Sequence, residues 1–239
     1  MPLSAPIHRL KRRARLLSRT EKIPLHQALD RLAASEGFAS WGLLTAKAAD
    51  ATTPAGSLFM RLGPGDMLLV GARPGQGKTL MSLELAVEAM KAGSRAVFFT
   101  LEYTHADILD RFRSIGVEPA DFNGLFEFDN SDAISAAYII GKLHAAPRGT
   151  LAVIDYLQLL DQKRENPELT VQVPMLRAFA RDRGLIMVFI SQIDRQYDCS
   201  KKPFPDIVDV RLPNPLDLSL FNKRCFLNRG DVRFQAASA

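Results

Sequence analysis

The sequence predicts an α/β fold, in which a mostly parallel central sheet is flanked by helices and preceded by a small helical module. Two observations carry this prediction. From Leu58 onward, short apolar segments alternate with longer amphipathic ones, as expected for strands covered by helices. A glycine-rich segment at 71–79 separates the first expected strand from the first expected helix of this region. With 239 residues, the chain has room for one sizeable domain and an appendage.

The expected strands are short and rich in β-branched and aromatic residues, and they lie at 67–70, 96–100, 125–128, 151–154 and 186–190. The expected helices fill the intervals between strands, at 78–92, 104–114, 133–143 and 170–182. The C-terminal segments 225–228 and 232–234 are predicted to form a hairpin around residues 229–231.

Residues 1–47 are predicted to form the helical module. Ile7, Leu10, Ala14 and Leu17 repeat at helical spacing. A second helix should open at Pro24 and end near residue 37, and a third apolar patch surrounds residues 41–44. Residues 48–57 have the small, polar, proline- and glycine-containing composition of a linker. The remaining residues, 58–239, should form the α/β domain.

The positive charge is concentrated at the N-terminus. Residues 1–50 contain nine Lys and Arg against four Asp and Glu, a net charge of +5, whereas residues 51–239 contain 22 of each sign. This excess has two interpretations that the sequence leaves open. It is either a solvated helix face or a contact surface for nucleic acid or an acidic partner.

Nothing in the composition predicts a membrane or secreted protein. The longest apolar run, 184–190, has the length of a buried strand, and the basic N-terminus lacks the apolar stretch of a secretory signal. Cys199 and Cys225 form neither a metal-ligand pattern nor a disulfide framework, which fits a reducing compartment. We therefore expect a cytoplasmic protein without a membrane partner.

The segment 72–79 fits the [AG]-x4-G-K-[ST] pattern of a phosphate loop, in which backbone N–H groups and a helix N-terminus surround phosphate oxygens. Lys78 would reach the β- and γ-phosphates, and the Thr79 hydroxyl would hold Mg²⁺. The alternative is a glycine-rich turn without a ligand. The residues predicted to bind the nucleotide are Ala72, Arg73, Pro74, Gly75, Gln76, Gly77, Lys78, Thr79 and Leu80.

Three polar residues follow expected strands and are candidates for work on ATP. Asp155 ends an apolar strand and could organise Mg²⁺ and its water shell. Glu102 follows the strand at 96–100 and could polarise the attacking water, although a capping or solvated acid is an equal alternative. Gln192 follows the strand at 186–190 and could hydrogen-bond the γ-phosphate, or could be an ordinary polar residue at a strand end.

Taken together, four runs resemble the successive motifs of the motor domain of DnaB-type replicative DNA helicases: GARPGQGKT (71–79), FFTLE (98–102), VIDYLQLL (153–160) and SQIDR (191–195). The resemblance covers roughly 58–231, and VIDYLQLL is its most specific part. It implies a RecA-like P-loop core with Glu102 as catalytic base, Gln192 as γ-phosphate sensor and Asp155 as the Mg²⁺-organising acid. It also implies ATP and Mg²⁺ as ligands, single-stranded DNA as partner, and a homo-oligomer such as a hexameric ring.

The segment after Gln192 resembles the polar region that lines the DNA channel in such motors. Arg195, Lys201 and Lys202 could contact phosphates there, or could belong to a solvated loop. The sequence departs from the family after Arg211, where Leu-Pro-Asn-Pro replaces a more acidic stretch. The family's large N-terminal helical domain is also not matched by residues 1–47.

A further departure is that the family's basic segment beyond the terminal hairpin, which supplies an arginine finger, has no counterpart. Arg224, Arg229 or Arg233 could substitute for it.

Two functions follow from these features. One is an ATP-driven helicase or translocase on single-stranded DNA. The other is a nucleotide-gated DNA-binding or regulatory protein with weak ATPase activity and no strand separation. A small-molecule phosphotransferase is a third option, but it would share only the phosphate loop and would leave the runs at 153–160 and 191–195 without an explanation.

Overall fold

The computed structural model describes residues 7–50, 53–163, 165–200, 202–212 and 214–236. The chain divides into two compact units. The first contains Met1–Thr53 together with Arg113–Gly116, and the second contains Pro54–Phe112 and Val117–Ala239.

The second unit is built on a seven-stranded sheet with the order β3-β2-β4-β5-β1-β6-β7. All neighbouring strands are parallel except β6 and β7, which form the antiparallel C-terminal hairpin. The predicted α/β class with a mostly parallel sheet is confirmed. The bounds are β1 Met67–Ala72, β2 Ala96–Thr100, β3 Phe126–Asp129, β4 Leu151–Asp155, β5 Ile186–Gln192, β6 Lys223–Asn228 and β7 Asp231–Ala236.

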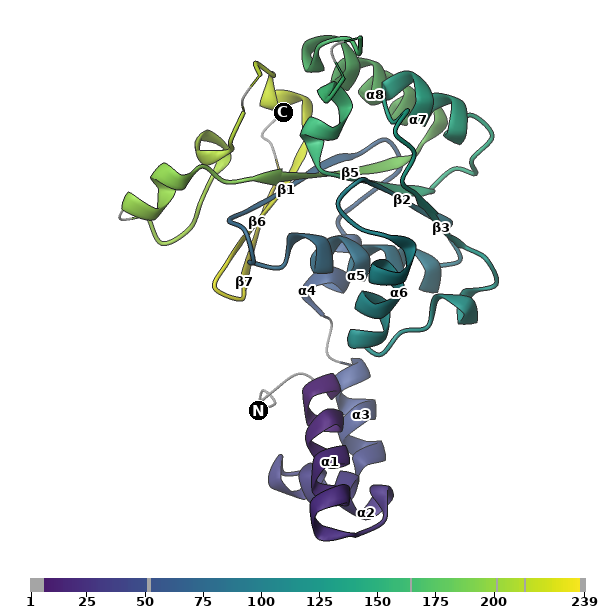
Figure 1. Ribbon diagram of the computed structural model, residues 1–239, viewed down its shortest axis with the longest axis vertical. Coiled ribbons are helices and arrows are strands. Elements are labelled where there is room, and N and C mark those ends of the chain that lie inside the picture. The colour runs from purple at the N-terminus through teal and green to yellow at the C-terminus, as the bar shows by residue number, and fades with distance from the viewer. Residues whose placement is uncertain (1–6, 51–52, 164, 201, 213, 237–239) are drawn as a thin grey trace. The chain divides into compact units, whose positions relative to one another are not determined.

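Helices cover both faces of this sheet, with α7 and α8 on one side and α4, α5 and α6 on the other (Figure 1). Every residue of β1, β2 and β4 is buried, as expected for strands that are covered on both faces, and this explains their uninterrupted apolar sequences. The α-helices are α4 Pro54–Phe59, α5 Lys78–Lys91, α6 His105–Ser114, α7 Ala136–Leu143 and α8 Leu169–Arg183.

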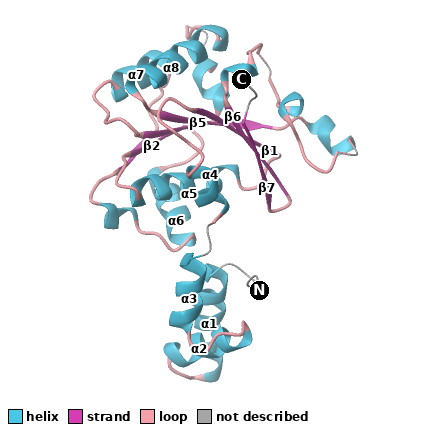
Figure 2. Cartoon of the chain, turned by 180° about the vertical axis from the view of Figure 1, so that it is seen from behind, coloured by secondary structure: helices cyan, strands magenta, loops and turns pink. Residues whose placement is uncertain are grey.

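The main core lies between the sheet and helices α7 and α8. Met67, Phe99, Ile154 and Phe189, from four adjacent strands, are at most 1% exposed and belong to one packed cluster. Figure 2 shows the helices, strands and loops from behind. Several of the remaining connections contain short 3₁₀ helices. They are η1 Pro119–Phe122, η2 Leu157–Asp161, η3 Arg195–Cys199, η4 Ile207–Asp209 and η5 Leu218–Leu220.

The described part of the first unit contains the helices α1 Ile7–Glu21, α2 Leu25–Ser35 and α3 Trp41–Asp50. The first two match expected helices, and the third carries the apolar patch that was expected at 41–44. Leu10, Ala33 and Leu44 are fully buried together, and Phe38 and Trp41 pack against them. The backbone N–H of Trp41 donates to the Asp30 carboxylate at 2.8 Å, which ties the start of α3 to α2. Ala14 and Ala28 are fully buried too, so the buried side chains of the described part of this unit are few and mostly small.

One expected feature differs in the structure. Residues 54–57 were expected to belong to a linker, but Pro54–Phe59 forms helix α4, in which Ala55, Gly56 and Leu58 are buried. Proline is well suited to the first turn of a helix, because its fixed φ is helical and its missing N–H would have no intrahelical partner there. None of the helices that the structure describes has both the length and the apolarity needed to cross a bilayer.

Candidate nucleotide site

The predicted phosphate loop connects β1 to the N-terminus of α5. Gly75 and Gly77 have positive φ values of 76° and 88°, a backbone conformation that favours glycine. The first intrahelical bond of α5 runs from Met81 N to Gly77 O at 2.9 Å, so the N–H groups that precede Met81 have no intrahelical acceptor. A helix N-terminus with such N–H groups is a favourable site for phosphate oxygens.

Asp155 lies directly against the loop. It is the last residue of β4, it is 2% exposed, and its Oδ2 accepts a hydrogen bond from Thr79 Oγ1 at 3.1 Å. Lys78 is half-buried, and its Nζ donates to Arg73 O at 3.3 Å. The structure therefore brings Lys78, Thr79 and Asp155 together, as the sequence predicted, although Thr79 and Asp155 are 76 positions apart.

The electrostatics of these groups are strongly coupled. Burial raises the pKa of Asp155 to about 7, and the negative charge of Glu102 adds to the increase. The hydrogen bond from Thr79 and the cations of Lys78 and Arg111 act in the opposite direction. Burial also lowers the pKa of Lys78, against the influence of Asp155 and Glu102. A buried carboxyl that is costly to ionise suits a site that receives a cation.

Glu102 follows β2, next to β4 in the sheet, where Thr100 pairs with Asp155. Its backbone N–H donates to the Thr100 hydroxyl at 3.0 Å, and its side chain is exposed. The Glu102 carboxylate is near enough to influence the pKa of both Asp155 and Lys78. An exposed carboxylate beside a buried one is available to act on a solvent-derived nucleophile.

Gln192 is the last residue of β5, in register with Ala72, the first residue of the loop. The N–H of the next residue, Ile193, donates to Ala72 O at 3.1 Å. Gln192 therefore stands at the same sheet edge as Asp155 and the phosphate loop, because β1, β4 and β5 are parallel neighbours. Its role as a sensor stays a prediction.

Arg111 was not singled out by the sequence, although its charge reaches the site. It lies on α6, stacks on the Tyr103 ring with its guanidinium carbon 4.3 Å from the ring centroid, and helps to lower the pKa of Asp155. Only the packing of α6 against the sheet brings it there, since Arg111 lies nine residues after Glu102 in an ordinary amphipathic helix.

Two further contacts of the phosphate loop were also missed. The Arg73 guanidinium forms an ion pair with Asp198 at 2.7 Å and donates to Ile193 O at 3.0 Å, so this side chain is engaged with the segment after β5. Gln76 Oε1 accepts from Arg229 N at 2.7 Å, in the turn between β6 and β7. The Arg73–Asp198 and Gln76–Arg229 partners lie 125 and 153 positions apart in the sequence, so no local pattern could have revealed them.

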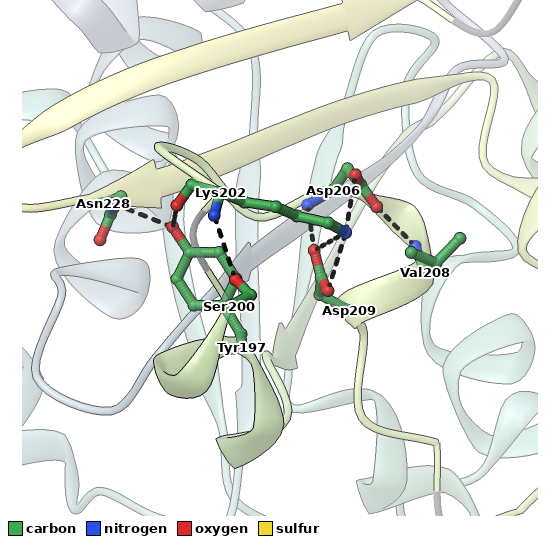
Figure 3. A network of polar contacts seen from close by, with 7 residues as sticks. All are labelled: Tyr197, Ser200, Lys202, Asp206, Val208, Asp209 and Asn228. Atoms are coloured by element: carbon green, nitrogen blue, oxygen red, sulfur yellow. Dashed lines mark hydrogen bonds and ion pairs between the residues drawn. The ribbon is translucent and has the colours of Figure 1, made fainter.

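In the segment after Gln192, Lys202 was expected to contact DNA phosphates or to be solvated, but it is engaged in a network of polar contacts within the chain (Figure 3). Lys202 Nζ forms ion pairs with Asp206 at 3.2 Å and Asp209 at 3.0 Å, so its charge is balanced within the chain. Its backbone is held too, because its carbonyl accepts from the Tyr197 hydroxyl at 3.2 Å. Arg195 is exposed, and Lys201 lies outside the described residues.

The three arginines considered as substitutes for a finger have different surroundings. Arg224 Nη2 donates to Leu218 O at 3.4 Å, and the Arg233 guanidinium carbon lies 5.0 Å from the centre of the Phe204 ring. Arg229 is in the turn that touches Gln76 of the phosphate loop. Of the three, Arg229 is therefore the one placed beside this chain's own loop by a direct hydrogen bond.

A phosphate loop that opens a helix, faced by an acid from a nearby parallel strand, defines a P-loop ATPase of RecA-like fold. The chain belongs to the KaiC ATPase family, whose sequence model, described as "ATPase: KaiC", matches residues 60–207. Its relatives include a replicative DNA helicase DnaB of Mycoplasma genitalium, 23% identical over 200 residues, with 67% of this chain and 43% of that relative covered. The resemblance to the DnaB motor is thereby confirmed.

Solved structures agree on the fold. One solved ATPase domain superimposes with a TM-score of 0.58 at 20% identity, covering 78% of this chain and 81% of that one. A DnaB-like replicative helicase, from a study of its interactions with primase, gives a TM-score of 0.62 at 19% identity, covering 90% of this chain and 64% of the other. This chain spans about two fifths of the length of the curated relatives that it matches.

Proposed function

We propose that this protein is an ATP-hydrolysing, DnaB-like helicase or translocase that acts on single-stranded DNA as a homo-oligomer in the cytoplasm. The observation that carries the proposal is the convergence of Lys78, Thr79 and Asp155, with Glu102 within electrostatic range, at one edge of a parallel sheet. The family and its DnaB relatives support the ATPase part directly. The action on DNA goes beyond them.

Each residue of the nucleotide site would have its own role in ATP hydrolysis. N–H groups at the start of α5 and the Lys78 ammonium would bind the β- and γ-phosphates and stabilise charge that develops on them. The Thr79 hydroxyl and the Asp155 carboxylate offer hard oxygen ligands to Mg²⁺, which supplies further charge neutralisation when bound. Glu102 would orient the attacking water and accept its proton. The Gln192 amide would sense whether the γ-phosphate is present.

The ATPase test compares the native protein with Lys78→Ala and Glu102→Gln. Native protein should hydrolyse Mg-ATP. Lys78→Ala should lose nucleotide binding, because the ammonium that contacts the phosphates is gone. Glu102→Gln should keep nucleotide binding but hydrolyse about 10²- to 10⁴-fold more slowly, which is the usual contribution of a general base. Native protein that fails to bind Mg-ATP, or a Glu102→Gln variant with the native rate, would refute the site assignment.

The translocase is distinguished from a nucleotide-gated regulator by two further measurements. A motor should show ATPase activity that single-stranded DNA stimulates, and strand displacement that Lys78→Ala abolishes. A regulator should bind DNA in an ATP-dependent way without separating strands. The pairing of Lys202 with two aspartates favours this second function, because it removes one cation from those expected to grip DNA. A sizing column with a non-hydrolysable ATP analogue tests whether a ring assembles.

A further inference from the structure

Several basic residues of α1 form a slanted row on the exposed face of this helix. Lys11, Arg15 and Arg19 are four residues apart, a spacing that places successive side chains above one another on a helix. Arg12 adjoins the row, since it is three residues before Arg15. All four side chains are exposed, and among the described side chains none of them forms an ion pair or a hydrogen bond.

The opposite side of α1 fixes this orientation. Leu10 and Ala14 are fully buried, and Leu10 packs with Ala33 and Leu44 in the core of the unit. The helix therefore cannot turn its cations inward without exposing its apolar residues. Because its apolar side is used within the unit, α1 also lacks the free apolar face that an interfacial membrane helix needs, Leu16 being its one exposed large apolar residue among those described.

No acid of α1 offsets the row until its last residue. The first 20 residues of the chain contain no Asp or Glu, and Glu21 is taken by an ion pair with Arg31. Asp30 is engaged with the backbone of Trp41. Residues 1–50 thus present a concentrated positive field, whereas residues 51–239 are neutral overall. Such a field attracts a polyanion, and arginine forks match phosphate oxygens well.

The positions of the aromatic residues distinguish between single-stranded nucleic acid and duplex DNA as the polyanion bound. Proteins that bind single-stranded nucleic acid add exposed aromatic rings on which bases stack. In residues 1–50 the only aromatic rings besides histidine are Phe38 and Trp41, and both pack against the small core. A row of cations without a stacking surface suits the double helix, whose binding is dominated by its closely spaced phosphates. From Lys11 to Arg19 the row is about 12 Å long, so it would face about seven duplex charges.

We propose that the α1 row is a second DNA-binding surface, which holds duplex DNA through its phosphates without reading sequence and without nucleotide. This goes beyond the proposed function, because the ATP-dependent site acts on a single strand through another part of the chain. A motor with such a surface would keep hold of the duplex next to the strand on which it works.

The test uses the full chain without nucleotide and measures its affinity for a short labelled duplex and for one of its strands. The variant carries Lys11→Gln, Arg15→Gln and Arg19→Gln, which keep a helix-compatible side chain. The matched control carries Arg177→Gln, Arg181→Gln and Arg183→Gln on α8, which remove the same charge elsewhere. A charge-keeping variant carries Lys11→Arg, Arg15→Lys and Arg19→Lys. Circular dichroism checks that each variant keeps its helices.

We expect the α1 variant to bind duplex about tenfold or more weakly, and the α8 control and the charge-keeping variant to bind as the native protein does. Each lost phosphate contact should reduce the salt slope by about 0.9. Between about 50 and 200 mM salt, the native protein should therefore lose about 40-fold more affinity than the α1 variant. ATP hydrolysis in the absence of DNA should be unchanged, so a failure here is distinguishable from a failure of the ATPase assignment.

Four results would overturn the proposal. The α1 variant could retain native duplex affinity, or the α8 control could lose as much as the α1 variant, which would make the effect one of net charge alone. The loss could fall on the single strand and spare the duplex. Finally, the native protein could prefer anionic phospholipid vesicles to duplex DNA, which would assign the row to a lipid surface. If any of these results is found together with native ATPase activity, the α1 surface is rejected and the nucleotide site assignment is kept.

Discussion

Replacing Asp155 by Asn should stabilise the ligand-free protein, and increasingly so as the pH rises. Asp155 is 2% exposed, and its pKa is raised from 3.8 to about 7, chiefly by burial. Between these two values the unfolded chain releases the proton while the folded protein keeps it. Asp155 therefore lowers the free energy of unfolding progressively as the pH rises from about 4 to about 7, and its effect is constant above that. The shift of about three pH units corresponds to about 4 kcal/mol at 1.36 kcal/mol per unit.

The assay is urea unfolding of both proteins at pH 5 and pH 8 without Mg²⁺. Asn cannot ionise, and its amide oxygen can still accept the hydrogen bond from Thr79. With an unfolded pKa of 3.8 and a folded pKa of about 7, the stability advantage of the Asp155→Asn variant over the native protein should grow by about 2.5 kcal/mol between these pH values. The same variant should lose Mg²⁺-dependent ATP hydrolysis. An advantage that does not change with pH would refute the burial argument and, with it, the electrostatic description of the site.

Three further predictions concern the surroundings of the site. Arg111→Ala should raise the midpoint of the Asp155-dependent stability profile, because the Arg111 cation lowers the pKa of Asp155; an unmoved midpoint in urea unfolding repeated across the pH range 4–9 would contradict this. A double-mutant cycle of Arg73→Ala and Asp198→Ala should give a coupling energy of about 1 kcal/mol or less in unfolding measurements, since the two side chains are 21% and 54% exposed. A much larger coupling would mean that the pair is dehydrated. Lys202→Ala should lower the unfolding free energy slightly, because it leaves two carboxylates without their cation, while single-stranded DNA affinity stays close to native; a large loss of DNA affinity with unchanged stability would show that Lys202 contacts DNA.

The strands and the phosphate loop could be predicted because their causes are local. A strand covered on both faces is almost continuously apolar, so the residues 151–154 are recognisable as such a strand from the sequence. Gly75 and Gly77 are needed where the loop takes positive φ. From there, the parallel order of the strands was enough to bring Asp155 to Thr79, because the carboxyl ends of parallel strands share one edge of the sheet.

The features that were missed depend on how distant segments pack. The contact of Arg73 with Asp198 and that of Gln76 with Arg229 arise from the meeting of chain segments at the sheet edge, and no spacing in the sequence encodes them. One other feature did carry a local signal, because Pro54 stands where a helix starts. The ion pair of Lys202 with Asp206 did not, since the segment between them contains Pro203 and Pro205 and is not helical.

The run VIDYLQLL is the most specific part of the resemblance to DnaB motors. The structure gives a reason for its residue Gln158, which phosphate binding alone does not need. Gln158 Nε2 donates to Arg211 O at 3.1 Å, and Arg211 N donates to Gln192 O at 2.8 Å. The next residue, Ile193, forms two hydrogen bonds with the phosphate loop: its N–H donates to Ala72 O, and its carbonyl accepts from the Arg73 guanidinium. Hydrogen bonds thus run without a break from the loop through the end of β5 to the segment around Arg211. Because these bonds join backbone atoms, a displacement of Gln192, if it acts as the proposed γ-phosphate sensor, would be passed to the segment around Arg211. The polar residues beyond β5 are therefore connected by hydrogen bonds to the phosphate loop, which is what either of the two proposed functions would require.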